Sequence, residues 1–362
     1  MPTNRLAYLD RVRGFAVLVM IEAHVLDAWT RLSDRGTKAY ADAMILGGFG
    51  APMFLFLAGL TFVLAAESTY RKTEDLRLAW QTVQKRGWQI FGLAFLFRLQ
   101  SFVLGGGFNA IGLLKVDILN VMGPAIVLMA VTGSFARTRL GRALMFAGVA
   151  GTIAMVTPIV RTTPLLAWMP DPLEWYLRPS PARTNFTLFP WAGFVFAGAI
   201  VGEVMGVWRD AGRTVRIQMA LVAAGLLLVA ASYEASLMPT IYPASDFWTS
   251  SPTFFFLRVG IITLMLPLAF LWERAPWKGV IGPWSPVEEL GRASLFVYWI
   301  HVEMVYGFLG RPLRRNLSFP AAIAADVAFS AFILSLVLLK NRLMTTRRAS
   351  ALRASRPSPA SI

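Results

Sequence analysis

Cysteine is absent from the 362 residues, and histidine occurs only 2 times. Without a thiol the chain can form no disulfide, thiolate nucleophile or thiolate metal site, and so few histidines argue against a His-built metal centre. We therefore expect no metal. Charged residues are also scarce, at 15%, whereas 56% of the residues are hydrophobic and the mean hydropathy is +0.57. This balance excludes an ordinary soluble domain and predicts a polytopic membrane protein.

The few charges are mostly basic and give a net charge of +15. In a membrane protein, Lys and Arg gather in cytoplasmic loops, where they also meet anionic lipid. We therefore assign the lipid bilayer as the partner of this charge and expect no nucleic acid.

Apolar segments that could cross a hydrocarbon core of roughly 30 Å recur along the chain. They fall at 13–30, 44–66, 87–105, 114–133, 143–160, 187–207, 217–235, 253–272, 287–309 and 320–341. We expect an all-α transmembrane helical bundle of about ten spans at 1–342, followed by a disordered basic cytoplasmic tail at 343–362. Lys and Arg are richer in the set of alternate loops that includes both termini, which predicts that both termini are cytoplasmic.

The stretch "RGFAVLVMIEAH" places ionisable groups inside the first span. Eleven residues at 100° each return to within about 20°, so Arg13 and His24 share one helix face, roughly 16 Å apart. Asp27 lies one turn beyond His24. Such groups are costly at membrane depth unless they face protein or water. We interpret His24 as a base or proton relay whose tautomer Asp27 fixes; the alternatives are a histidine bonded to a neighbouring helix and an Arg13 that snorkels.

The second histidine ends the stretch "SPVEELGRASLFVYWIH". Its Ser-x-x-Glu pattern with Pro predicts that a helix begins at about residue 286. Ser294, Tyr298 and His301 then share one face, at i, i+4 and i+7. Either this face forms interhelical hydrogen bonds, or it lines the same pocket as His24.

Further polar residues are expected at a similar depth. Arg98 and Arg258 lie within spans, and "KVDILNVMGP" adds Asp117 and Asn120 at i and i+3. Together with the histidines, these groups predict a wet, polar cavity in the outer half of the bundle. Guanidinium groups suit phosphates or carboxylates, because they are always charged and can bind bidentately.

Several motifs together resemble a known family. "RLAYLDRVRGFAVLVMIEAH" is similar to the N-terminal signature of integral-membrane acyltransferases, in which an Arg, ten residues and a His mark the first span. "GAPMFLFLAG", "KVDILNVMG", "LFPWAGFVFAGAIVG" and "LGRASLFVYWIH" resemble the bacterial relatives of lysosomal heparan-α-glucosaminide N-acetyltransferase, in order along nearly the whole chain. The resemblance implies a protein of the bacterial inner membrane that transfers an acyl group, most simply acetyl, from cytoplasmic acetyl-CoA to a saccharide on the far side.

On this basis we assign site residues as hypotheses. His24, Asp27 and His301 are the catalytic candidates, with His301 as a second polar wall or the base itself. Arg13, Arg98 and Arg258 are candidates for binding acetyl-CoA, and Asp117, Asn120 and Tyr298 for binding the saccharide. One departure limits the transfer of mechanism: the lysosomal enzyme uses a histidine in its first lumenal loop and has Asn at the position corresponding to His24, whereas residues 31–43 here contain no histidine. An acyl-histidine intermediate in that loop is therefore excluded.

Two other functional classes stay open. Intramembrane Asp, Glu, His and Arg also occur in proton-coupled transporters of anionic or sugar-like solutes, although the two halves of the chain show no internal repeat. A non-catalytic scaffold would leave the convergent charges unexplained. The sequence is compatible with a homo-oligomer and does not distinguish O-acylation from N-acylation.

Overall fold

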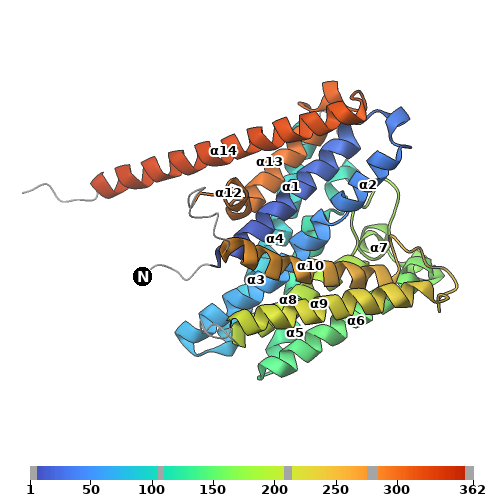
Figure 1. Ribbon diagram of the computed structural model, residues 1–362, viewed down its shortest axis with the longest axis vertical. Helices are drawn as coiled ribbons and strands as arrows, with labels where there is room; N and C mark the ends of the chain where they lie inside the picture. The colour runs from blue at the N-terminus through green and yellow to red at the C-terminus, as the bar shows by residue number, and fades with distance from the viewer. Residues whose placement is uncertain (1–5, 105–109, 208–213, 275–283, 355–362) are drawn as a thin grey trace, which may run out of the picture.

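The computed structural model describes residues 6–104, 110–207, 214–274 and 284–354. Within these ranges the chain is helical and has no strand; two isolated bridges join Thr30 to Leu317 and Val116 to Thr184. The predicted all-α class is therefore confirmed (Figure 1). The α-helices are α1 (Ala7–Trp29), α2 (Lys38–Gly47), α3 (Gly50–Thr73), α4 (Leu76–Leu104), α5 (Ile118–Phe135), α6 (Arg139–Thr162), α7 (Asp171–Leu177), α8 (Leu188–Val207), α9 (Thr214–Leu237), α10 (Pro252–Arg274), α12 (Pro286–Arg292), α13 (Ser294–Tyr306) and α14 (Phe319–Ala354). Short 3-10 turns η1 (Leu32–Asp34), η2 (Ala110–Leu114), η3 (Pro164–Trp168) and η5 (Arg311–Leu313) lie in the connections.

Membrane-spanning capacity can be judged from helix length and composition. In the described ranges, 7 segments are long and apolar enough to cross a membrane: Lys38–Thr73, which includes α2 and α3, and segments of α5, α6, α8, α9, α10 and α14. Helix α1 is also long, but Arg13, Glu22 and Asp27 interrupt its apolar character. The protein is thus an all-α membrane bundle, while ten spans and cytoplasmic termini stay predictions.

The predicted span at 287–309 is divided into two helices. Ser285 caps α12 by accepting a hydrogen bond from the amide of Glu288, with Pro286 in the first turn, as the sequence pattern predicts. At Ala293 the backbone (φ −105°, ψ 17°) leaves the α-helical conformation, and α13 begins at Ser294. This break redirects the chain so that α13 packs along α1.

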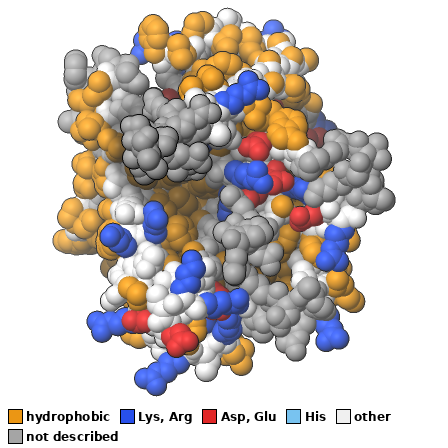
Figure 2. Space-filling model, turned by 90° about the vertical axis from the view of Figure 1, so that its left-hand side faces the viewer, with side chains coloured by type: hydrophobic (Ala, Val, Ile, Leu, Met, Phe, Trp, Pro, Cys, Tyr) orange, Lys and Arg blue, Asp and Glu red, His pale blue; other side chains and the backbone are white. Residues whose placement is uncertain are grey.

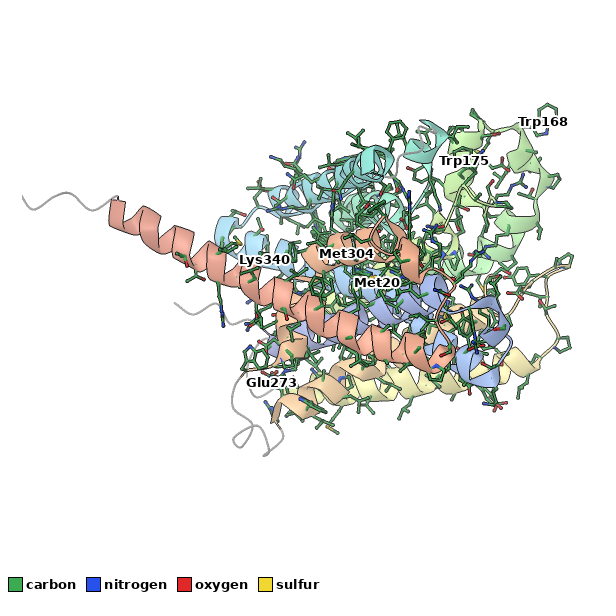
Figure 3. All side chains as sticks on the ribbon, turned by 90° about the horizontal axis from the view of Figure 1, so that it is seen from above. Met20, Trp168, Trp175, Glu273, Met304 and Lys340 are labelled. Carbon is green, nitrogen blue, oxygen red and sulfur yellow. The ribbon has the colours of Figure 1, made fainter. Side chains whose placement is uncertain are left out.

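Helix α14 is longer than the sequence predicts. It continues to Ala354, so residues 343–354 are helical and the expected disordered tail does not begin at 343. Ala, Leu and Arg are strong helix formers, and a helix already nucleated by the preceding span propagates through them. The rest of the expected tail, residues 355–362, lies outside the described residues. Figures 1 and 3 show the C-terminal part of α14 projecting beyond the bundle.

Glycine allows a very close helix contact between α3 and α8. A Cβ atom at Gly59 would lie 1.8 Å from the carbonyl oxygen of Val195, and one at Gly198 would lie 1.8 Å from that of Phe56. The two backbones are therefore in direct contact, which only glycine permits at these positions.

A second close contact joins α12 to the start of α1. A Cβ atom at Gly14 would lie 1.8 Å from the carbonyl oxygen of Val287, and one at Gly291 would lie 1.8 Å from that of Asp10. This contact fixes α12 against α1, and α13 follows it along the same helix. The second histidine of the chain is thereby brought to the first.

A buried ion pair joins α6 to α8. The guanidinium nitrogens Nε and Nη2 of Arg142 lie 2.5 and 2.9 Å from the carboxylate oxygens of Glu203. The Arg142 guanidinium also donates to the carbonyls of Ala136 and Arg137 and lies 5.9 Å from the centre of the Trp80 ring. Both charges are thus compensated inside the bundle.

Basic side chains gather at one end of the molecule. Figure 2 views the end to which the start of α1 belongs, and Lys and Arg side chains cluster over its lower part, where α3 ends and α4 begins. The C-terminal end of α14 points the same way. We assigned these basic loops to the cytoplasm from the sequence, and that assignment stays a prediction.

Candidate active site

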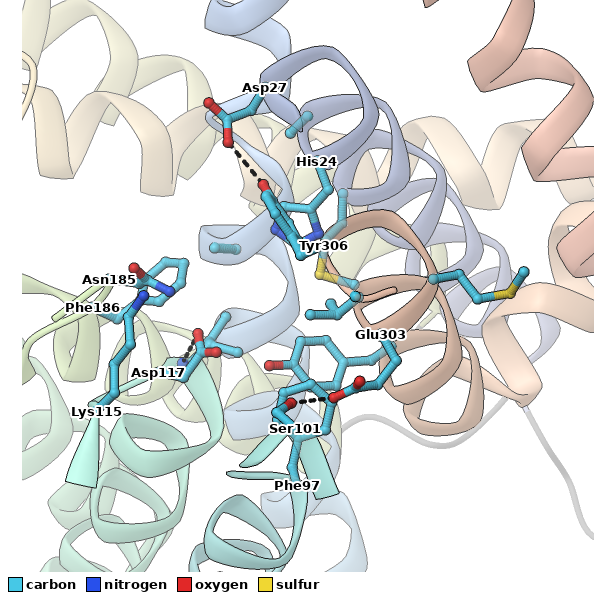
Figure 4. A pocket seen from close by; sticks show the side chains of 18 of the residues that line it. His24, Asp27, Phe97, Ser101, Lys115, Asp117, Asn185, Phe186, Glu303 and Tyr306 are labelled. Atoms are coloured by element: carbon cyan, nitrogen blue, oxygen red, sulfur yellow. Dashed lines mark hydrogen bonds between the residues drawn. The ribbon is translucent and has the colours of Figure 1, made fainter. Parts of the chain in front are cut away.

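A cavity of about 1250 Å³ lies among α1, the α2–α3 junction, α4, the start of α5 and α13. Met20 and Met304, which belong to its lining, lie in the middle of the bundle (Figure 3). Polar and ionisable side chains face it from several helices (Figure 4). These are His24, Asp27, Arg98, Ser101, Lys115, Asp117, Thr184, Asn185, Tyr298, Glu303, Tyr306, Arg311 and Arg314. The predicted polar cavity is therefore present.

The two histidines form a hydrogen-bonded pair. Nδ1 of His24 lies 2.9 Å from Nε2 of His301, and Nδ1 of His301 lies 2.7 Å from the carbonyl oxygen of Val297, one turn earlier in α13. His301 is fully buried, whereas His24 lines the cavity. His301 itself does not line the cavity, and its bond to His24 is the interhelical hydrogen bond of the first sequence alternative; of the same face, Tyr298 lines the cavity.

This geometry assigns the tautomers of both rings. A carbonyl oxygen only accepts, so Nδ1 of His301 carries the hydrogen and its Nε2 holds a lone pair in the neutral ring. Nδ1 of His24 must then donate to His301. The remaining nitrogen of His24, Nε2, has the free lone pair and is the atom that can accept a proton.

Asp27 has partners other than the ring of His24. One carboxylate oxygen accepts a hydrogen bond of 2.9 Å from the hydroxyl of Tyr306, and the other lies 3.6 Å from Nη1 of Arg35 (Figure 4 shows the Tyr306 contact). The Tyr306 ring packs edge-on against His24, with centroids 5.4 Å apart. Asp27 therefore reaches His24 only through Tyr306 among the described contacts. In the structure, His301 and not Asp27 is the side chain that bonds to the His24 ring.

Arg98 and Asp117 form an ion pair in the cavity wall. Nη2 of Arg98 lies 2.7 Å from Oδ2 of Asp117, and both residues line the cavity. Asp117 also caps α5, and the Asn120 side chain accepts from the Asp117 amide at 3.1 Å, which completes a capping box. Asn120 is 1% exposed, does not line the cavity, and donates to the Tyr176 hydroxyl at 3.4 Å. Its spacing from Asp117 thus reflects a helix cap, and the structure does not place Asn120 at the cavity.

The other two arginines of the hypothesis lie elsewhere. Arg13 pairs with Asp10 at 2.7 Å near the start of α1, away from the cavity. The Arg258 guanidinium lies 3.9 Å from the centre of the Phe254 ring. It lies next to Gly48, which lines the cavity, but Arg258 itself does not line it. Of the three arginines predicted to bind acetyl-CoA, the structure thus places only Arg98 at the cavity.

Tyr298 lines the cavity, as the helical spacing with His301 predicts, although only 2% of its surface is exposed. The sequence reasoning missed Glu303, whose carboxylate accepts a hydrogen bond from the Ser101 hydroxyl (Figure 4). Glu303 could have been found from the sequence, because it is an ionisable residue inside an apolar span, which is the criterion that identified His24. Lys115 offered no such signal, because it lies at the end of a span.

Residues 5–230 match the family model described as "Heparan-alpha-glucosaminide N-acetyltransferase, catalytic". The chain belongs to this family. It is therefore a member of a family of membrane acetyltransferases, as the sequence motifs indicated. The match includes His24, Asp27, Arg98 and Asp117, whereas His301 lies beyond it. None of the curated proteins matches the chain.

Proposed function

We propose that the protein transfers an acetyl group from acetyl-CoA to a saccharide, with His24 as the general base. The observation that carries this proposal is the His24–His301 pair, which leaves Nε2 of His24 free to accept a proton. A base with this lone pair, held beside a polar cavity within an apolar bundle, suits the chemistry of the acetyltransferase family.

In the proposed reaction, the acceptor nitrogen or oxygen attacks the thioester carbonyl while Nε2 of His24 takes its proton. The new bond to the acetyl carbon forms, the carbon–sulfur bond breaks, and His24 returns the proton to the leaving CoA thiolate. His301 acts as a positioning residue, because its lone pair holds the Nδ1 hydrogen of His24 throughout.

The developing oxyanion has two candidate partners. Helix α3 begins beside the cavity at Gly50, and Ala51, in its first turn, belongs to the lining. First-turn amides lack intrahelical acceptors and carry the positive end of the helix dipole. Arg98, held in the wall by Asp117, is the second. Ala51→Pro removes the amide hydrogen of residue 51, and Pro is tolerated in the first turn of a helix. If Ala51→Pro lowers turnover and the control Ala51→Ser does not, the amide is the partner of the oxyanion; if neither does, Arg98 is.

Glu303 favours an amino sugar as the acceptor. Asp27 and Asp117 each lie within 4.0 Å of an arginine, whereas in the described part of the chain no salt bridge is seen for the Glu303 carboxylate. An amino sugar would bind as its ammonium form and supply the missing positive charge; it must then pass one proton to the Glu303 carboxylate before its nitrogen can attack, and His24 takes the second proton. We therefore favour N-acetylation over O-acetylation.

We place the donor on the cytoplasmic side because Lys and Arg predominate in the loops that share a side with both termini. In sealed inside-out vesicles, acetyl-CoA added outside should be consumed without permeabilisation. Consumption only in right-side-out vesicles would overturn this sidedness and leave the reaction itself untouched.

The reaction is tested with purified protein, labelled acetyl-CoA and an oligosaccharide that ends in glucosamine. We expect acetylated product, and His24→Ala should lower turnover by about 10² to 10⁴, the contribution of a general base. Leu165→Ala, at an exposed leucine of η3 outside the cavity, is the matched control. Uptake of unmodified saccharide into proteoliposomes without acetylated product would instead support a transporter.

A further inference from the structure

Side chains of α4 and α13 contact one another beside the cavity. The Trp299 indole donates to the Gln100 amide oxygen at 2.7 Å, and the Ser101 hydroxyl donates to Glu303. The Phe97 and Trp299 rings pack edge to face, with centroids 5.1 Å apart. These contacts link two helices that otherwise border the cavity from different sides.

Beyond this seam the cavity has an apolar rim. Phe308 and Leu309, in the connection after α13, belong to its lining, yet their side chains are 67% and 66% exposed. Val103, near the end of the adjoining helix α4, is 65% exposed. Exposed apolar side chains of this kind would bind a lipid chain, whereas a soluble saccharide gains little by contacting them.

Two guanidinium groups lie beside this rim. Arg311 and Arg314 both line the cavity; the Arg311 guanidinium lies 5.3 Å from the centre of the Phe308 ring, and Arg314 donates to the Tyr306 carbonyl at 2.7 Å. Tyr306 in turn packs against His24. Anion-binding groups therefore lie between the apolar rim and the base. Guanidinium binds phosphate strongly, because it offers two parallel donors.

We propose that the acceptor is a saccharide carried on a membrane lipid through a phosphate. The lipid chain would contact Phe308 and Leu309 as it leaves the cavity. The phosphate would bind Arg311 and Arg314, and the sugar would lie next to His24. This inference rests on the proposed function and adds the chemical class of its acceptor. A saccharide without lipid would use the polar part of the cavity alone.

The test compares glucosamine 1-phosphate with its polyprenyl ester, each with full-length protein in nanodiscs. The ester should have a kcat/KM higher by about tenfold or more, the factor expected from burying part of a lipid chain on apolar side chains. Replacing both rim residues (Phe308→Ser with Leu309→Ser) should bring that ratio toward one. Leu165→Ser, at a leucine 73% exposed outside the cavity, should leave it unchanged.

Equal use of both acceptors would overturn the inference and leave the acetyltransferase proposal standing, whereas acetylation of neither would contradict the proposed function. A binding measurement addresses the lipid separately. Because the chain has no cysteine, Leu309→Cys gives a single thiol, which the polyprenyl ester but not glucosamine 1-phosphate should protect from a maleimide. Ile241→Cys, at a residue 78% exposed elsewhere, is the control. Equal labelling of Leu309→Cys with and without the ester would also overturn the inference.

Discussion

Replacing His301 by two different side chains separates a positioning role from a catalytic one. In His301→Leu the Nδ1 hydrogen of His24 loses its acceptor, so His24 can adopt the other tautomer, in which Nε2 no longer accepts a proton. An unpaired buried donor costs about 1–3 kcal/mol, which corresponds to a fall in turnover of roughly 5- to 150-fold. His301→Gln places an amide oxygen near the position of Nε2. It should therefore recover turnover to within about tenfold of the wild type, since one neutral hydrogen bond contributes about 0.5–1.5 kcal/mol.

The assay is acetyl transfer at saturating acetyl-CoA, with nitrogen-15 NMR of labelled histidine as a second readout. Only 2 histidines occur in the chain, so each ring can be assigned by substituting the other. The wild type should show His24 with hydrogen on Nδ1, and His301→Leu should shift its population toward the other tautomer. If His301→Gln is as inactive as His24→Ala, His301 is itself the base and the assignment of Nε2 of His24 is wrong.

Three further predictions concern stability in detergent, measured by thermal or denaturant unfolding. Gly198→Ala should lower the free energy of unfolding by about 1–3 kcal/mol or more, because a Cβ atom there would lie 1.8 Å from the Phe56 carbonyl oxygen. The control Gly148→Ala, where a Cβ atom would have nothing within 4 Å, should be neutral or slightly stabilising. Equal effects of the two substitutions would contradict the α3–α8 contact. Arg142→Met should cost about 3–5 kcal/mol because it leaves Glu203 buried without its cation, and adding Glu203→Leu should recover most of that loss; no recovery would show that the charge is not the cause. The hydrogen bonds from Arg31 and from the amide of Phe319 hold the pKa of Asp34 below its usual 3.8, so its contribution is present above that value and is lost as pH falls through the lower, folded-state pKa. The difference in melting temperature between the wild type and Asp34→Asn should therefore stay constant from about pH 6 to pH 4 and shrink as the pH falls further. A difference that stays constant below about pH 4 would exclude the carboxylate charge as its origin.

Hydropathy alone predicts the helical membrane bundle, because each long apolar run must satisfy its backbone internally. It does not predict how far a helix continues past the bilayer. The basic composition of residues 343–362 predicts a disordered tail, yet α14 extends to Ala354. Propagation of an existing helix outweighed the composition of the tail.

Helical spacing predicts which residues share a face of one helix, but not which faces of two helices meet. It placed Asp27 with His24 correctly along α1, and it could not show that Tyr306 and Arg35 would hold the carboxylate. The partner of His24 is His301, 277 residues later. Their meeting depends on the close approach of α12 to α1, which no pattern within either segment specifies.

The histidine pair and the rim of the cavity are under very different packing constraints. The pair depends on a backbone contact at Gly14 and Gly291 that no other residue fits, whereas Phe308 and Leu309 are mostly exposed. Substitutions at the rim therefore cost little folding stability, while substitutions that displace α12 cost much. During evolution, the rim can accordingly vary more freely than the glycine contact that holds α12 against α1. On the proposed function, substitutions at the rim would then change the acceptor without moving His301 away from His24.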